Sequence, residues 1–222
     1  MFPKDIDSLT AQQLMCACTS AVMHTYNTCC ASVTQLLGDN FSKNSTIQLM
    51  RKKLNKRLCM DDIYEICILT HGNNRQKAEL YQLTLDEDER ISTNALWVFT
   101  HFDITNNEWL YAKHDELIDR VLVEKSMTKL RLLLSLLIRQ PFEKASLRSD
   151  FIDFCVGKIT ACSYPYAIRA LCMKLAYEQM KYYPELLTEL NEALDMLEQE
   201  VLSPGLASAK RQVMKKIKKA LS

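Results

Sequence analysis

The chain has 222 residues, 48% of them hydrophobic, and its 28 Lys and Arg against 27 Asp and Glu leave a formal net charge of +1. This apolar content is enough for a core and argues against a disordered chain, while the near-neutral charge excludes a whole-molecule field that would attract nucleic acid or acidic membranes. The N-terminal stretch carries acids where a secretory signal would be basic, and no window approaches the roughly 18 apolar residues of a membrane span. We therefore expect a soluble, cytoplasmic protein.

The few chain breakers predict a helical protein. There are only 4 Gly and 5 Pro, and between them apolar residues such as Ile91, Ala95 and Val98 recur with helical period. No alternating strand pattern stands out. The pattern predicts, in chain order, helices over 8–37 (with a break near 25–27 left open), 44–58, 61–70, 74–84, 87–102, 107–123, 127–140, 148–162, 165–183, 185–200 and 206–221.

The first of these segments is rich in cysteine and invites a zinc interpretation. It contains Cys16, Cys18, His24, Cys29 and Cys30. On a helix only residues three or four apart share a face closely enough to chelate one ion, and no two of these residues have that spacing. The odd total of 9 cysteines also argues against a disulfide framework. We predict cysteines packed in or near the core.

Cys67 and His71 do stand four apart, near the end of a predicted helix. Two ligands do not make a metal site, so an ordinary packed cysteine and a loop histidine are expected. His101 and His114 have no nucleophile or carboxylate context, and the chain contains no P-loop, GxSxG, GxGxxG or HExxH motif. We therefore predict no metal, no cofactor and no assignable catalytic residue.

An internal repeat explains the stretch TLDEDERISTNALWVFTHF at 84–102. Aligned basic residues lie 39, 41, 38 and 41 positions apart, at Arg51, Arg90, Arg131, Arg169 and Lys210. The positions one before, three after and seven after each of them share a helical face and are apolar, except Glu89 and Thr93. Trp97 falls on the seventh position, which predicts that it packs in the core or between repeats. The acids at 86–89 suit the first turn of a helix, where the dipole favours negative charge.

This pattern resembles the HEAT and armadillo class of α-solenoid, whose units of about forty residues pair two antiparallel helices. In HEAT units an Asp in the turn precedes an Arg of the second helix, as Asp86 or Asp88 precedes Arg90 here; Pro165 and Pro204 stand where later units would carry that Asp. The resemblance implies an all-α superhelix of stacked antiparallel helix pairs. We expect a single domain over 1–222, with an N-terminal helical cap over 1–40 and about five HEAT-like units over 41–222.

The C-terminal stretch AKRQVMKKIKKALS gathers the residues that we predict as partner-binding. They are Lys210, Arg211, Lys215, Lys216, Lys218 and Lys219. The pattern favours another interpretation over partner binding, in which the acids of 185–200 compensate this charge within the last hairpin. A third is that the lysines contact nucleic acid phosphates. The basic run RKKLNKR at 51–57 has the same alternatives.

A stacked helical array offers an extended surface, and the sequence lacks a recognisable catalytic set. The expected function is therefore a non-enzymatic scaffold that binds another protein or a peptide. The alternative is a nucleic-acid enzyme resembling the HEAT-like DNA glycosylases that excise alkylated bases, a likeness of architecture alone. A hydrolase whose residues converge from distant segments is a third possibility.

Overall fold

The structure is a computed structural model that describes residues 43–199 and 202–221. The chain divides into two compact units, 1–46 and 47–222, and the described residues belong to the second unit apart from 43–46, where the first described helix begins. The helix predicted over 8–37 and the cap predicted over 1–40 lie outside the described residues, as do Cys16, Cys18, His24, Cys29 and Cys30.

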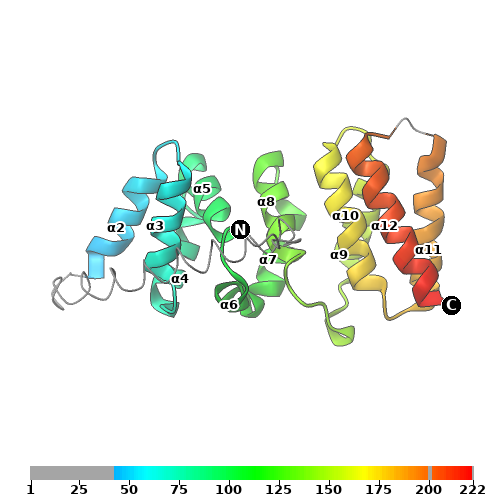
Figure 1. Cartoon of the computed structure of the whole chain (residues 1–222), viewed down its shortest axis with the longest axis horizontal. Helices are drawn as coiled ribbons and strands as arrows, with labels where there is room; N and C mark the ends of the chain where they lie inside the picture. Colours follow the sequence, from blue (N-terminus) through cyan, green and yellow to red (C-terminus); the bar gives the residue numbers. More distant parts are fainter. Residues whose placement is uncertain (1–42, 200–201, 222) are drawn as a thin grey trace, which may run out of the picture. The chain divides into compact units, whose positions relative to one another are not determined.

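Every regular element of the described residues is a helix (Figure 1). The α-helices are α2 (Lys43–Leu54), α3 (Met60–Thr70), α4 (Asn74–Leu83), α5 (Glu89–Phe99), α6 (Ile104–Asn107), α7 (His114–Val123), α8 (Met127–Leu137), α9 (Ser149–Thr160), α10 (Tyr166–Met180), α11 (Pro184–Asp195) and α12 (Pro204–Leu221). Three short 3-10 helices join them: η1 (Glu108–Lys113), η2 (Lys144–Ser146) and η3 (Met196–Gln199). Pro184 and Pro204 are the first residues of their helices, where a missing backbone N–H costs nothing.

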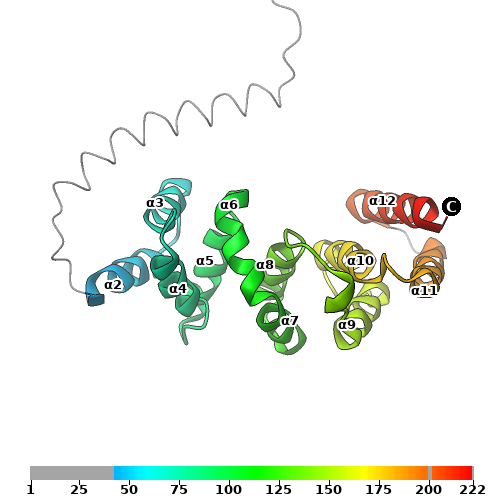
Figure 2. The same cartoon turned by 90° about the horizontal axis from the view of Figure 1, so that it is seen from below.

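The helices pack as pairs, and the pairs stack on one another. Within pairs α4 packs on α5, α7 on α8, α9 on α10 and α11 on α12. Between pairs the second helices follow one another, α5 against α8, α8 against α10 and α10 against α12, and α9 contacts both α7 and α11. In Figure 2 α7, α9 and α11 lie along one side and α8, α10 and α12 along the other. This arrangement confirms the predicted all-α architecture of stacked helix pairs.

The predicted apolar stripe forms much of the core. Its buried members are Met50, Leu54, Leu58, Leu130, Leu134, Ile168, Cys172, Ala176, Ala209, Val213 and Ile217. The aligned basic residues behave differently along the chain, since Arg90 and Arg131 are exposed whereas Arg169 and Lys210 are buried. The Arg169 Nε donates to the carbonyl of Ile159, 2.8 Å away, so this guanidinium caps the end of α9.

Side chains of one pair also bind the helix ends of the pair before it. The Arg120 guanidinium on α7 donates to the carbonyl oxygen of Thr84 at 3.0 Å and to its hydroxyl at 2.9 Å, just beyond the end of α4. The Tyr182 hydroxyl donates to the carbonyl of Phe142, 40 positions earlier. The carbonyl of Thr84 lies at the end of α4 and that of Phe142 in the loop after α8, so these bonds satisfy groups that have no partner within a helix.

The single helix predicted over 107–123 is wrong, because the segment is divided into α6, η1 and α7. Asn106 and Asn107 are buried at the division, and their amides bond outside their own helix. The Asn106 Oδ1 accepts from the backbone N–H of Gly72 at 3.4 Å, and the Asn107 Nδ2 donates to the carbonyl of Arg139 at 3.3 Å. Short polar side chains that bond elsewhere compete with regular helix, which accounts for the break.

The predicted helix over 44–58 ends early, at Leu54. Arg51 therefore lies in the last turn of α2 rather than at the start of a second helix, and the first aligned position departs from the others. The helix that packs against α5 from this side is α3. Helix α2 ends early because Asn94 of α5 binds carbonyls at and just beyond its end: the Asn94 Nδ2 donates to the carbonyls of Leu54 and Lys56 at 2.8 and 3.0 Å.

The thiols of α3 and its N-cap should differ sharply in reactivity. Cys59 is exposed, whereas Cys67 is half-buried and burial raises its pKa to about 12. Because the thiolate is the reactive form, we expect iodoacetamide at pH 8 to modify Cys67 at least about tenfold more slowly than Cys59. Peptide mapping by mass spectrometry measures both rates, and urea, which unfolds the chain, should bring them together. Equal rates in the folded protein would contradict this placement of Cys67.

Candidate functional site

One helix face departs from the repeat pattern, and it belongs to α5. The buried residues of α5 are Ile91, Ser92, Ala95, Leu96, Val98 and Phe99. The stripe positions of α5 are exposed at Glu89 and half-buried at Thr93 and Trp97, whereas those of the other units are buried except for the half-buried Ile138. Because positions 89, 93 and 97 follow one another at four-residue steps, they form a continuous face, which Arg90 and Asn94 widen. Helix α5 thus presents a polar face with one aromatic ring.

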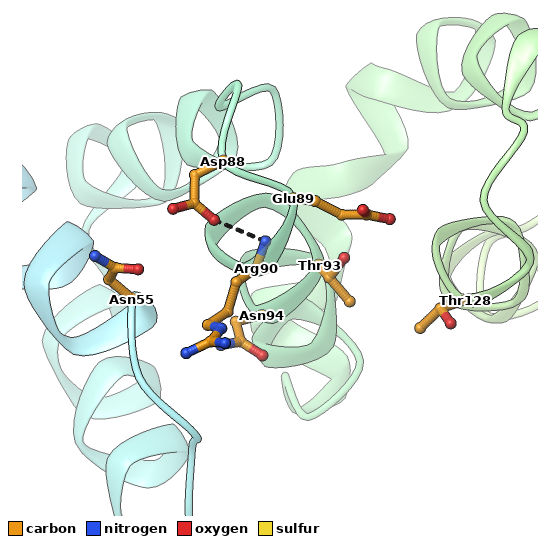
Figure 3. A pocket seen from close by; sticks show the side chains of 7 residues that line it. All are labelled: Asn55, Asp88, Glu89, Arg90, Thr93, Asn94 and Thr128. Atoms are coloured by element: carbon orange, nitrogen blue, oxygen red, sulfur yellow. Dashed lines mark hydrogen bonds between the residues drawn. The ribbon is translucent and has the colours of Figure 1, made fainter.

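The acids before α5 hold its start in place. The Asp88 carboxylate accepts from the backbone N–H groups of Arg90 and Ile91, at 2.9 and 3.3 Å, and is the N-cap (Figure 3). Asp86 accepts two bonds from the Arg51 guanidinium, at 2.8 and 3.1 Å, and this pairing lowers the pKa of its carboxyl. Asp86 is one of the two acids predicted to precede Arg90 in a HEAT-like ladder. Its partner is Arg51, the aligned basic residue one repeat before Arg90.

A groove runs over the polar face of α5. Its first part has a volume of about 690 Å³ and is open to solvent; Figure 3 shows the lining side chains, with Arg90 and Asn94 directed to the same side and Thr128 of α8 across the opening. The lining residues of this part are Asn55, Asp88, Glu89, Arg90, Thr93, Asn94 and Thr128. The second part, of about 470 Å³, is lined by Lys56, Arg57, Leu58, Arg90, Asn94 and Trp97. We call the two parts together the α5 groove.

Asn94 joins the two walls of the α5 groove. Its amide holds the carbonyls of Leu54 and Lys56, so the segment after α2 is fixed against α5. The Trp97 ring makes an edge contact with the His101 ring, with centroids 5.7 Å apart, and is packed against the core. The groove is therefore built by contacts between units, which no local sequence pattern encodes.

The charges of the α5 groove are unevenly distributed. Lys56 is bound to the Asp62 carboxylate at 2.8 Å, and hydrogen bonds from Lys56 and Cys59 lower the pKa of Asp62 to about 2. Within the described residues no carboxylate lies within ion-pair distance of the side chains of Arg57 or Arg90. In the part of the chain that the structure describes, these two guanidinium groups are exposed and have no carboxylate partner.

The six C-terminal residues predicted to bind a partner all lie on α12, away from the residues that line the α5 groove. Lys210 is buried, whereas the other five are exposed: Arg211, Lys215, Lys216, Lys218 and Lys219. Lys216 pairs with Glu178 of α10 at 3.3 Å and lies over the Tyr177 ring. Their role in partner binding stays a prediction.

The two residues considered as metal ligands lie at the C-terminal end of α3. His71 is the C-cap of α3, and its ring contacts the Asn106 amide at 2.7 Å and the Asp103 carboxylate at 3.7 Å, while Cys67 is half-buried one turn earlier. Among residues 43–199 and 202–221, no group of three or more His, Cys, Asp or Glu side chains could hold a metal ion. No helix in this part of the chain is long and apolar enough to cross a bilayer.

Comparison with known proteins yields one match. The sequence model of a family described as a HEAT repeat domain matches residues 50–217, a range that runs from α2 into α12. No curated protein and no solved structure matches the chain.

Proposed function

Because the chain belongs to the HEAT repeat family, we propose that it is a non-enzymatic scaffold that binds another protein or a peptide, and that the α5 groove is the binding surface. The observation that supports this proposal is the polar and aromatic face of α5. Helices in a stacked array gain stability by burying apolar side chains at these positions, so Glu89 and Thr93 contribute less there than the apolar residues of the other units. Binding would explain why this unit departs from the pattern.

The composition of the α5 groove also suits a protein partner. Arginine and tryptophan are the side chains that most often dominate the energy of protein interfaces, and Arg90 and Trp97 lie two turns apart on one helix. The groove is open along its length, as an extended segment requires.

We also propose that 41–222 forms about five units and that the protein acts in the cytoplasm. Cys59, Cys67, Cys155 and Cys172 are free thiols, which persist in reducing compartments.

Affinity capture with matched variants tests this proposal. The tagged full chain, its Arg90→Glu variant and an Arg131→Glu control are each incubated with host lysate, with and without nuclease. Arg131 is exposed at the aligned position of α8 and does not line the α5 groove, so it controls for a general change of charge. We expect a protein recovered by the wild type and Arg131→Glu, resistant to nuclease, and lost with Arg90→Glu.

Two results would contradict the proposal. Recovery of the same proteins by Arg90→Glu would place binding elsewhere, and α12 would be the next surface to mutate. Loss of the captured material on nuclease treatment would favour the nucleic-acid alternative, and base-excision assays would be the next step.

A further inference from the structure

We propose that the second part of the α5 groove binds an acidic peptide segment, whose carboxylates pair with Arg57 and Arg90 and whose neighbouring apolar side chain packs on Trp97. This inference rests on the proposed scaffold function and specifies the chemistry of the partner. It is drawn from the lining of this part, which brings together three basic side chains, one aromatic ring and no acid.

The two arginines are the groups that an anion would meet. The neighbouring basic side chains already form ion pairs, Lys56 with Asp62 at 2.8 Å and Arg51 with Asp86 at 2.8 Å. Arg57 and Arg90 are exposed, and a guanidinium offers paired N–H donors that match the two oxygens of a carboxylate.

The backbone that carries Arg57 is held in place before any ligand binds. The Asn94 amide fixes the carbonyls of Leu54 and Lys56, and the buried Leu58 side chain anchors the chain on the other side of Arg57. Binding therefore requires ordering of the arginine side chains but not of the loop, which lowers the entropic cost of association.

The first part of the groove sets the direction of the segment. It has two acids, Asp88 and Glu89, and shares Arg90 and Asn94 with the second part. Asp88 is engaged as the N-cap of α5, while Glu89 is exposed. A peptide with its acids at Arg57 and a basic residue at Glu89 meets opposite charges at both ends.

The same distribution disfavours a nucleic acid. A phosphate backbone carries negative charge along its whole length, so a strand that reached Arg57 and Arg90 and continued along the groove would run past Asp88 and Glu89. A peptide changes its charge from residue to residue and avoids this repulsion.

Fluorescence anisotropy on the full chain tests this inference. The probe is a fluorescein-labelled peptide, Lys-Gly-Leu-Glu-Glu-Leu-Glu, compared with the same peptide carrying Gln in place of Glu and with a labelled dT8 oligonucleotide. We expect the Glu peptide to bind at least about tenfold more tightly than either comparison probe, and the Arg57→Ala, Arg90→Ala double variant to lose about tenfold in Kd.

Two further variants separate the groove from general charge and test the apolar contact. Trp97→Ala should weaken binding by about tenfold, and Arg131→Ala on α8 should leave it unchanged. Equal binding of the Gln peptide, tighter binding of dT8, or an Arg131→Ala loss as large as that of the double variant would overturn the inference.

The two proposals fail in different ways. If capture depends on Arg90 but the Glu peptide does not compete with the captured protein, the acidic-segment inference is wrong and the scaffold proposal stands. If the Arg90→Glu variant recovers the same proteins as the wild type, the α5 groove is not the binding surface and both proposals fail.

Discussion

Replacing Phe99 by Ala should lower the free energy of unfolding by about 4 kcal/mol, the largest effect that we expect from a single substitution in this chain. Phe99 is fully buried, and its ring lies among three others: Phe102 at 4.8 Å, Tyr81 at 6.0 Å and Trp109 at 6.3 Å between centroids. These rings come from α4, α5, η1 and the loop after α5, so the cavity would open between elements that cannot easily close it.

Urea denaturation followed by far-UV circular dichroism measures this loss. Phe99→Leu is the matched control, because it keeps an apolar side chain in the space and should cost less than about half as much. If Phe99→Leu and Phe99→Ala lower the free energy of unfolding by nearly the same amount, the contacts between rings contribute more to stability than the filled volume. A loss below about 1 kcal/mol for Phe99→Ala would contradict this packing of the four rings.

Replacing Arg139 by Met should cost about 2 to 3 kcal/mol, because this side chain closes the end of α5 from the next unit. Its guanidinium donates to the carbonyl of Thr100 at 2.8 Å, to that of Phe99 at 3.4 Å, and to that of Phe102. Arg139 is half-buried, and desolvation lowers its pKa from the ordinary value. Methionine keeps the apolar length of the side chain and removes every donor, so the carbonyls of Thr100 and Phe102 lose this partner, while that of Phe99 still accepts from the backbone N–H of Phe102 at 3.2 Å.

The matched control is Arg131→Met on α8, since Arg131 is exposed. It should change stability by less than about 0.5 kcal/mol. Urea denaturation of both variants gives the comparison, and amide hydrogen exchange at the end of α5 should be accelerated in Arg139→Met alone. Equal costs for the two variants would mean that the inter-unit bonds of Arg139 add nothing beyond its surface charge.

The repeat could be predicted from the sequence because its signals are local. Helical periodicity and the positions of Pro184, Pro204 and Gly72 locate helix boundaries, and α3, α4 and α8 begin within one residue of their predicted starts. The polar Glu89 and Thr93 are the two exceptions in the aligned stripe, and both line the α5 groove. They are the sequence signal for the site, although the sequence alone does not say why a stripe position is polar.

The rest of the site depends on contacts between units. Nothing near Asn94 in the sequence indicates that its amide binds carbonyls 40 and 38 positions earlier, and those bonds place Arg57 beside Arg90. Trp97 is expected to pack in the core or between repeats because its position is apolar in the other units. It does pack against the core, but it is half-buried and also lines the groove, which the repeat pattern did not predict. The C-terminal basic residues stand out because they are adjacent in the sequence, which says nothing about convergence with other segments.

The bonds between units also have a mechanical consequence. Arg120 reaches 36 positions back, Arg139 reaches 37 to 40 and Tyr182 reaches 40, so each of these ties joins a unit to its immediate neighbour. Units coupled in this way bear a load in series, so the changes in length at the individual interfaces add up along the array. Tension along the array would therefore act on the α5 groove, which is lined by residues of three successive segments, the loop after α2, α5 and α8.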